Sequence, residues 1–287
     1  MDVSVCIVNL NAKQHLASCL NLLSESLGSC SYEVIIVDNH SQDGSQEFIQ
    51  QEYPGFHLLI NHRNEGYTQA INSAIRVSRG DYLAVLNPDS EPGPNSIFTL
   101  IEFLKMNENI GIVGPKVIAS DGSFQRSCRR GVARPAAVFS YFLGLAKRYP
   151  NDQRFTGYHL NHLDENEINE VSGVSGSCMV IRRKTLKDIG YFDEQFFAYQ
   201  EDSDYCLRAK ERGWKVYYNP HSIVKHMGGM GGANSVPMKA IFEWHRSYYK
   251  YYIKHFADDY SMIFNIFYSL VMVGKLIFAE GKYLIKQ

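Results

Sequence analysis

Residues 80–91 read GDYLAVLNPDSE and contain an apolar run, residues 82–86, that ends directly at a polar turn. A short apolar run bounded by turn residues is typical of a strand that is buried on both faces. The chain repeats this pattern three times before residue 80, and the runs lie at residues 3–8 (VSVCIV), 33–37 (EVIIV) and 56–60. We therefore predict four buried strands in the first 90 residues.

Helical patterns separate these strands. Residues 15–27 carry leucines at positions 16, 20, 23 and 27, and residues 67–78 are apolar at a similar spacing. A third helix is expected from the turn at residues 41–45 to about residue 51. Strands that alternate with helices predict a parallel, doubly wound sheet, in which ligands bind at the carboxyl ends of the strands. The polar residues to consider are those just after the strands: Asn9, Asp38, Asn64 and residues 87–91.

The composition excludes several classes of protein. The 287 residues carry a net charge of −1 and are 45% hydrophobic and 21% charged, which excludes a disordered chain and disfavours nucleic acid as a partner. We find no apolar run of twenty uncharged residues, and so expect no obvious membrane span. The six cysteines are scattered without a metal-type spacing, and because the strand pattern begins at residue 3 we expect no signal sequence. Both features favour a cytoplasmic protein with reduced thiols.

The sequence lacks the glycine-rich loops that hold nucleotide phosphates. Neither GxxxxGK[ST] nor a GxGxxG after the first strand is present. A nucleotide-dependent enzyme of this kind would hold its phosphates through a divalent cation, Mg²⁺ or Mn²⁺, on carboxylates. Asp89 is placed for that role, and the alternative is an ordinary turn aspartate. His226, before a glycine loop, is either a further metal ligand or a structural histidine.

Asp38 and a cluster of three further acidic residues each have competing interpretations. Asp38 follows the second strand and either accepts hydrogen bonds from a ribose or base, or forms a turn with Ser41. Glu201, Asp202 and Asp204 cluster at an expected helix start. One of the first two would act as a general base while the other contacts the acceptor, or all three complement the helix dipole. Asp204 and Arg208 are expected to pair on the helix surface.

Seven segments in order resemble the GT-A glycosyltransferases of family 2, in the branch of rhamnosyltransferases and galactofuranosyltransferases. They are VSVCIVNLN (3–11), EVIIVDNHSQDGS (33–45), NEGYTQAIN (64–72), GDYLAVLNPD (80–89), GSCMVIRR (176–183), GYFDEQFFAYQEDSDYCLRAKERGW (190–214) and VKH (224–226). The resemblance covers residues 3–230. It implies an α/β fold with a mixed sheet flanked by helices, followed by a helical extension.

The resemblance also implies roles for individual residues. Asp202 matches the catalytic base, and Asp89 and His226 match the metal ligands. The nucleotide contacts are implied for Val8, Asn9, Asp38, Asn64 and Asn87. Asn87 stands where the family's DxD motif has its first aspartate, which removes one negative charge beside the diphosphate.

The implied reaction is inverting transfer of a sugar from a nucleotide donor. We expect L-rhamnose from dTDP-rhamnose, moved to a cell-surface polysaccharide or a polyprenyl-diphosphate-linked glycan. The alternatives are galactofuranose, glucose or N-acetylhexosamine from a UDP donor, a hydrolase of nucleotide sugars, or a non-catalytic binding homologue. We expect a catalytic domain over residues 1–235, with a nucleotide half to about 115 and an acceptor half from 116. Glu201, Arg126 and Arg129 are candidates for contact with the acceptor or sugar. Arg130 is a further candidate for contact with acceptor phosphate, although a solvated basic face fits the three arginines at least as well.

The tail, residues 236–287, differs from the rest of the chain. Thirteen of the 37 aromatic residues lie between Phe242 and Tyr283, and residues 239–287 carry seven Lys or Arg against four Asp or Glu. Two helices are expected, and Lys275, Lys282 and Lys286 fall roughly on one face. This pattern favours peripheral contact with the inner face of the cell membrane. The alternative is a helical hairpin against the domain or against a second subunit in a homo-oligomer.

Overall fold

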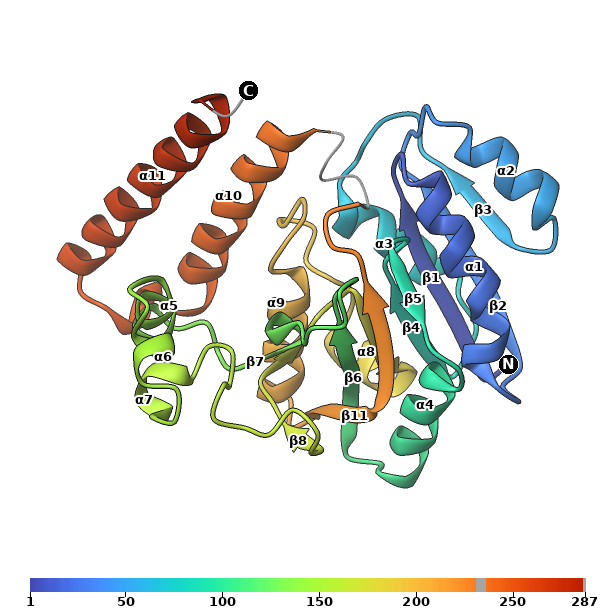
Figure 1. Ribbon diagram of the computed structural model, residues 1–287, viewed down its shortest axis with the longest axis horizontal. Coiled ribbons are helices and arrows are strands. Elements are labelled where there is room, and N and C mark those ends of the chain that lie inside the picture. The colour runs from blue at the N-terminus through green and yellow to red at the C-terminus, as the bar shows by residue number, and fades with distance from the viewer. Residues whose placement is uncertain (231–235, 286–287) are drawn as a thin grey trace.

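The computed structural model describes residues 1–230 and 236–285. Within these residues a mixed sheet of nine strands has the order β3-β2-β1-β4-β10-β6-β11-β5, and β8 pairs with β11 (Figure 1). Its strands are β1 (Val3–Asn9), β2 (Tyr32–Asp38), β3 (His57–Ile60), β4 (Tyr82–Leu86), β5 (Ser90–Pro92), β6 (Ile110–Ile118), β8 (Asn169–Glu170), β10 (Cys178–Arg182) and β11 (Lys215–His226). A small second sheet pairs β7 (Arg129–Arg130) with β9 (Gly173–Val174).

The first four strands of the prediction are confirmed as β1 to β4, and they are parallel. Asn9 pairs with Asp38 in the register of β1 and β2, so the polar residues that end these strands lie level with one another. The second half of the sheet differs from a purely parallel arrangement. β10 runs antiparallel between β4 and β6, which makes the sheet mixed, as the resemblance implied.

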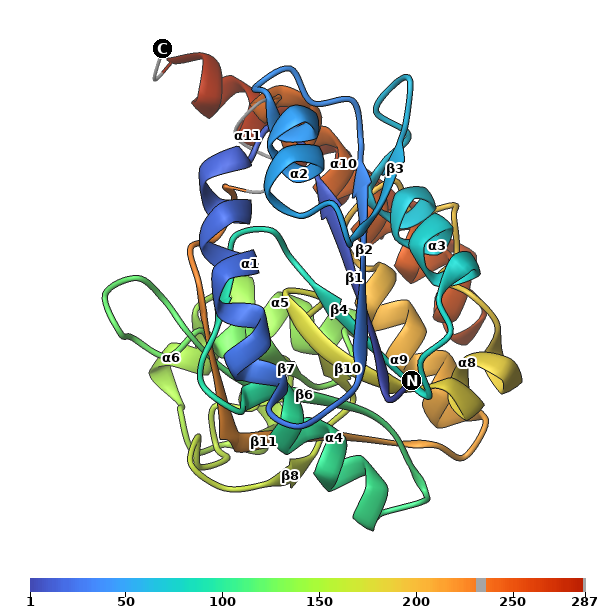
Figure 2. The ribbon, with the colours of Figure 1, turned by 90° about the vertical axis from the view of Figure 1, so that its right-hand side faces the viewer.

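Helices cover both faces of the sheet. α1 (Lys13–Leu27), α2 (Ser45–Glu52) and α4 (Ser96–Met106) bury their apolar residues on one face, and α3 (Tyr67–Val77), α8 (Arg183–Ile189) and α9 (Glu201–Glu211) on the other. Figure 2 shows α1 and α3 on opposite sides of β1 and β2. The leucines of α1 face the sheet because their spacing places them on one side of the helix. All six cysteines are buried and unpaired.

The C-terminal helices form a third apolar cluster with the middle of the chain. The short helix α5 (Pro135–Phe142) contributes Val138 to this cluster beside α10 (Pro237–His255), and α6 (Leu145–Arg148) and α7 (Gln153–Thr156) pack on α5. η1 (Arg126–Cys128) and η3 (Ala257–Asp259) are single turns. Tyr248 and Tyr252 of α10 pack with Tyr268 and Met272 of α11 (Met262–Ile285). The domain boundary expected after residue 235 falls beside residues 231–235, outside the described residues.

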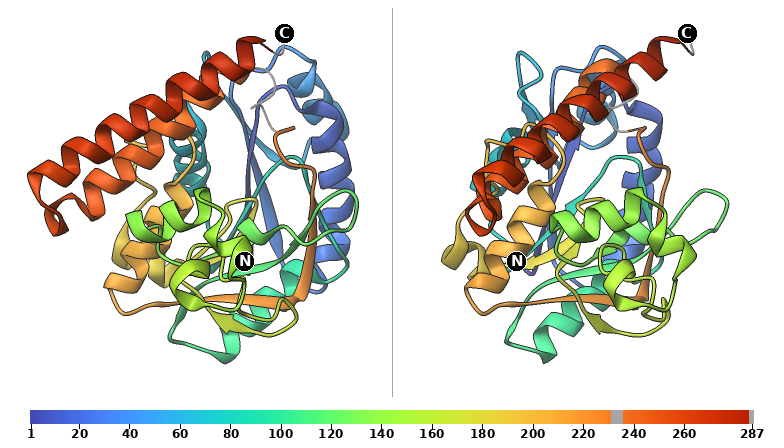
Figure 3. Two further views of the ribbon diagram at one scale, coloured as in Figure 1. Left: turned by 60° about the vertical axis from the view of Figure 1, so that its left-hand side comes forward. Right: turned by 90° about the vertical axis from the view of Figure 1, so that its left-hand side faces the viewer.

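α11 is the outermost of these helices (Figure 3). An apolar stripe along α11 is exposed: the exposed fraction is 81% for Ile263, 68% for Leu270 and 64% for Ile277. The length of α11, and a mean hydropathy of 1.9 over a stretch of 18 residues, would allow it to cross a membrane, which we did not expect from the sequence. Lys275 does not share an open face with Lys282, because it is packed inward against Trp244. Lys286 lies outside the described residues.

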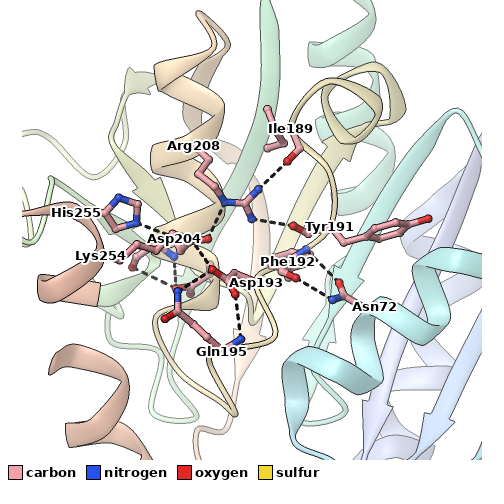
Figure 4. Close-up of polar contacts among 12 residues, drawn as sticks. Asn72, Ile189, Tyr191, Phe192, Asp193, Gln195, Asp204, Arg208, Lys254 and His255 are labelled. Atoms are coloured by element: carbon pink, nitrogen blue, oxygen red, sulfur yellow. Dashed lines mark hydrogen bonds and ion pairs between the residues drawn. The ribbon is translucent and has the colours of Figure 1, made fainter. Parts of the chain in front are cut away.

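A network of charged groups fixes α9 to α10 (Figure 4). The Asp204 carboxylate accepts hydrogen bonds from Arg208 (2.8 Å), Lys254 (2.5 Å) and His255 (2.8 Å). Burial raises the pKa of Asp204, but the His255 hydrogen bond and the Arg208 charge outweigh it and lower the pKa to about 2. The pair predicted between Asp204 and Arg208 is therefore present, but Asp204 is fully buried rather than on the helix surface.

Candidate active site

A cleft of about 570 Å³ lies at the carboxyl ends of β1 and β4. The residues that follow these strands form one wall, the start of α9 forms the floor, and aromatic residues of α5 and α10 form the far wall. The position agrees with the rule that ligands of α/β sheets bind where the strands end. Of the predicted site residues, the cleft is lined by Val8, Asn64, Asn87, Asp89, Glu201, Asp202 and His226.

Asn9 and Asp38 lie behind the cleft wall. Asn9 donates a hydrogen bond of 3.0 Å to Asp38, and the Asp38 carboxylate also accepts from the Ser41 backbone (2.9 Å) and from Gln46 (2.7 Å). Both residues are fully buried. Successive side chains of a strand point to opposite faces, so Val8 lines the cleft while Asn9 points away from it. The turn role that the sequence allowed for Asp38 is present, and its contact with a nucleoside stays a prediction.

Asn39 is a cleft residue that the sequence reasoning missed, although it directly follows Asp38. Its amide donates to Asn64 (3.0 Å), and its oxygen accepts from Asn61 (3.0 Å), so the side chain is held rigidly. The Asn64 oxygen also accepts from the backbone of Gly66 (3.0 Å). A side chain at Gly66 would lie 2.6 Å from the Phe197 carbonyl oxygen, and its φ of +91° also favours glycine. This close approach sets the loop before α9 against the start of α3.

Asp89 and His226 face each other in the cleft, and the role of metal ligands that the resemblance implies for them stays a prediction. β5 and β11 are antiparallel neighbours, and the pairing of Ser90 with His226 brings the histidine beside Asp89. Asp89 Oδ1 lies 3.2 Å from His226 Nε2, but neither atom makes an aligned hydrogen bond in the described part of the chain. Burial raises the pKa of Asp89, but the neighbouring His226 outweighs it, so the pKa lies below its ordinary value.

These two unsatisfied atoms fit a divalent cation. Carboxylate oxygen and imidazole nitrogen are both ligands of Mn²⁺, and Mg²⁺ is often bound by one or two carboxylates together with substrate phosphates. The described residues contain no group of three or more His, Cys, Asp or Glu that could hold a metal. Asn87, which lines the same wall, adds no charge. The protein would thus supply two ligands and leave the remaining positions to a diphosphate and water.

Asp202 is held in place by hydrogen bonds from three residues. Its Oδ2 accepts hydrogen bonds from Arg130 (2.5 Å) and from the Gly176 backbone (2.9 Å), and its Oδ1 accepts from the Ser203 backbone (2.6 Å). Asp202 lies in the first turn of α9, after Tyr199 and Gln200, which both have a positive φ. Non-glycine residues with positive φ are uncommon and occur often at functional sites. The sequence reasoning did not assign the Asp202 partner to Arg130.

Glu201 is buried in the cleft beside Asp202, and its Oε2 has no hydrogen-bond partner within the described residues. Burial and the neighbouring Asp202 carboxylate raise the pKa of Glu201 to about 8. The raised pKa favours the protonated form, a carboxylic acid that can donate a hydrogen bond into the cleft.

Two of the three arginines that were candidates for contact with the acceptor lie outside the cleft. Arg129 is buried and donates to the carbonyls of Leu163 (2.6 Å) and Asp164 (2.7 Å), so it is structural and the prediction was wrong for it. Arg126 is exposed outside the cleft, which Ser127 lines instead. Arg130, the neighbour of Arg129 on β7, points the opposite way and lines the cleft.

Family models and a sequence relative both match this chain to glycosyl transferases. The family described as Glycosyl transferase family 2 matches residues 4–190, and the related family group 2 matches residues 152–229. A relative from Mycobacterium tuberculosis, an N-acetylglucosaminyl-diphospho-decaprenol L-rhamnosyltransferase, is 32% identical over 204 residues, covering 67% of this chain and 66% of the relative. The chain thus spans slightly less than two thirds of that relative.

Two solved structures share the fold. GalNAc-T7 with UDP, GalNAc and Mn²⁺ superposes with a TM-score of 0.58 at 17% identity, covering 88% of this chain and 47% of that one. A mannosyltransferase from Pyrobaculum calidifontis in complex with GDP-Man and Mn²⁺ gives a TM-score of 0.57 at 15% identity, covering 88% and 63%. At these identities the likeness concerns the fold, which agrees with the GT-A fold implied by the sequence.

Proposed function

The chain belongs to glycosyl transferase family 2, and from that premise we propose that it moves a sugar from a nucleotide donor to an acceptor hydroxyl with inversion. One observation carries the proposal: Asp202 lines the same cleft as the facing pair Asp89 and His226. A group that can take a proton and a pair that can hold a cation are the two elements that such a transfer needs.

In the proposed reaction, Asp202 takes the proton of the acceptor hydroxyl, whose oxygen attacks the anomeric carbon from the face opposite the nucleotide. The bond from that carbon to the diphosphate oxygen breaks, and the nucleotide leaves. Asp89 and His226 would hold Mg²⁺ or Mn²⁺, which when bound neutralises charge on the departing diphosphate. The Arg130 and Ser203 hydrogen bonds fix the Asp202 carboxylate before the acceptor arrives.

For the donor we propose dTDP-L-rhamnose. The support is the relative from M. tuberculosis, whose name specifies L-rhamnosyl transfer. The two structural neighbours were solved with UDP and with GDP-Man. The competing donors that we consider are the UDP sugars. Val8, Asn39 and Asn64 line the donor end of the cleft, with Asn9 and Asp38 as the layer behind them.

For the acceptor we propose a glycan linked through a diphosphate to a lipid. The same relative is named for an acceptor of this kind, and α11 presents an exposed apolar stripe that suits a membrane surface. α11 packs lengthwise on α10, through Tyr268 and Met272, and this favours a helix that lies in the interface rather than one that crosses the bilayer. The enzyme would then work at the inner face of the cell membrane.

The test is a panel of nucleotide sugars with Mg²⁺ or Mn²⁺, read by thermal shift and then by transfer to a lipid-linked acceptor. We expect Asp202→Asn to abolish transfer while it retains the donor-induced shift. Glu211→Gln, an exposed change on the same helix, is the control and should transfer normally. Normal turnover by Asp202→Asn would remove Asp202 from the role of base. Donor binding without transfer in the wild type would favour the non-catalytic homologue, and release of free sugar would favour the hydrolase.

A further inference from the structure

The ammonium group of Lys275 is enclosed by aromatic rings at the side of α11 that faces the domain. Its Nζ lies 3.2 Å from the ring centroid of Phe142 and 4.3 Å from that of Trp244. It has no hydrogen-bond partner within the described residues. Burial lowers the pKa of Lys275 to about 8. Contact with two rings offsets only part of the free energy needed to bury an ammonium without an anion.

The two rings that enclose Lys275 also form the far wall of the cleft. The Trp244 ring lies 4.2 Å from that of Tyr248, whose hydroxyl is hydrogen-bonded to Tyr158. Arg130, the partner of Asp202, lines the same cleft as both tyrosines. A continuous wall of side chains therefore leads from the proposed base to the rings that cover Lys275.

Beyond Lys275 the surface becomes apolar. α5 ends at Phe142, whose side chain is 45% exposed, and the next residue, Leu143, is 73% exposed. On α11, Phe278 lies three residues after Lys275 on the same side of the helix and is 72% exposed. A ligand that follows this path meets a proton acceptor first, an unpaired cation second and apolar side chains last. That order matches a molecule built from a sugar, a phosphate group and a lipid chain.

We propose that Lys275 binds the phosphate group of the lipid-linked acceptor, which it reaches when the Phe142 ring turns aside. Phe142 is the last residue of a short helix and is nearly half exposed, so its ring can rotate with little loss of packing. The inference rests on the proposed function, because it extends the acceptor site of that reaction. It adds a positioning residue, contributed by the C-terminal helix, that sets how far the sugar enters the cleft.

The test measures binding of geranyl diphosphate, a short lipid with a diphosphate, by fluorescence of Trp244. The chain has one other tryptophan, Trp214, so all variants carry Trp214→Phe. We expect saturable binding that Lys275→Met weakens at least about tenfold, since a charge-assisted contact to phosphate is lost. Lys282→Met, at an exposed lysine of the same helix, is the matched control and should bind as the parent does. Lys275→Gln provides a second neutral variant if Lys275→Met unfolds.

Separate arms identify the source of the phosphate. Geraniol and inorganic diphosphate should each bind much more weakly than geranyl diphosphate. Vesicles of phosphatidylcholine with or without phosphatidylglycerol contain headgroup phosphate but no acceptor. A response to these vesicles that depends on Lys275, without one to geranyl diphosphate, would overturn the proposal in favour of a lipid headgroup. Equal affinity of parent and Lys275→Met for geranyl diphosphate would overturn it outright.

The binding of geranyl diphosphate can be measured whether or not the protein transfers sugar, because no donor is present in the assay. The donor-induced thermal shift of Lys275→Met should equal that of the parent, which places the loss on the acceptor side. A protein that transfers sugar to a lipid-linked acceptor with the same KM in both forms would refute the Lys275 site and leave the proposed function intact. A protein that binds geranyl diphosphate through Lys275 but transfers no sugar would support the Lys275 site and refute the proposed function.

Discussion

The Arg130 guanidinium donates a hydrogen bond of 2.5 Å to the Asp202 carboxylate, and both side chains are almost wholly enclosed in the cleft. The arginine belongs to β7, a two-residue strand, and the aspartate to the first turn of α9. The pair therefore joins the middle of the chain to the helix that we assign to catalysis. A buried ion pair of this kind contributes less to stability than it costs to break, because each partner alone is an uncompensated buried charge.

This relationship predicts strong coupling between the two positions. Arg130→Met should lower the free energy of unfolding by about 3–5 kcal/mol, because it leaves Asp202 buried without its cation. Combining it with Asp202→Asn should recover part of that loss, with a coupling energy of about 1–3 kcal/mol in a double-mutant cycle. Urea unfolding of the four proteins measures it. Arg134→Met, which breaks an exposed pair with Asp259, should change stability by at most about 1 kcal/mol. Additive losses would contradict the coupling.

The pair of Asp89 and His226 predicts where a metal binds. Asp89→Asn and His226→Ala should each weaken Mn²⁺ binding in the presence of UDP or dTDP by more than about tenfold, since each removes one of two protein ligands. Asn87→Asp should strengthen binding, because it restores the second carboxylate at the position where the charge is missing. Electron paramagnetic resonance of free Mn²⁺ reports the affinity. Asp81→Asn, at the exposed opposite end of β4, is the control, and an equal loss there would argue against this site.

The environment of Glu201 predicts a pH dependence of stability. Its pKa is raised to about 8 in the folded protein against an ordinary value of 4.5. Between these values the folded protein binds more protons than the unfolded chain, so Glu201 makes stability fall as pH rises. Glu201→Gln removes this loss, and its Tm advantage over the wild type should grow from pH 5 to pH 8 and then level off. Differential scanning fluorimetry measures it, with Glu211→Gln as the exposed control. Parallel curves for wild type and Glu201→Gln would refute the assignment.

The sequence predicted the strands and helices best in the part of the chain where the local spacing of apolar residues determines the structure. β1 to β4 and the helices between them follow from apolar periodicity, and the edge they form located Asp89. It predicted less where contacts are distant. β6 contains Gly111, Gly114 and Pro115, which obscure a strand pattern, and its partners β10 and β11 come much later in the chain.

In the candidate site, too, the sequence predicted features that depend on local pattern and missed those that depend on distant contacts. Periodicity did not reveal β7, so the sequence could not tell that Arg129 points inward and Arg130 into the cleft. The spacing of Lys275 and Lys282 correctly indicated a helix, but not that Trp244 of a neighbouring helix covers one of them. The facing of Asp89 and His226 depends on the antiparallel pairing of β5 with β11, which only the tertiary structure specifies.

The exposed stripe of α11 predicts that the full chain binds lipid vesicles. Leu270 and Ile277 are two-thirds exposed, and burying each such side chain in a membrane interface is worth about 1.5–3 kcal/mol. Changing both to Glu should therefore reduce flotation with vesicles by at least about a hundredfold in partition coefficient, while α11 stays packed through Tyr268 and Met272 on its other face. Met106→Glu, at an equally exposed apolar residue of α4, should float as the wild type does. Unchanged flotation, together with a dimer in light scattering that the two glutamates dissociate, would assign the stripe to a second copy of the chain instead.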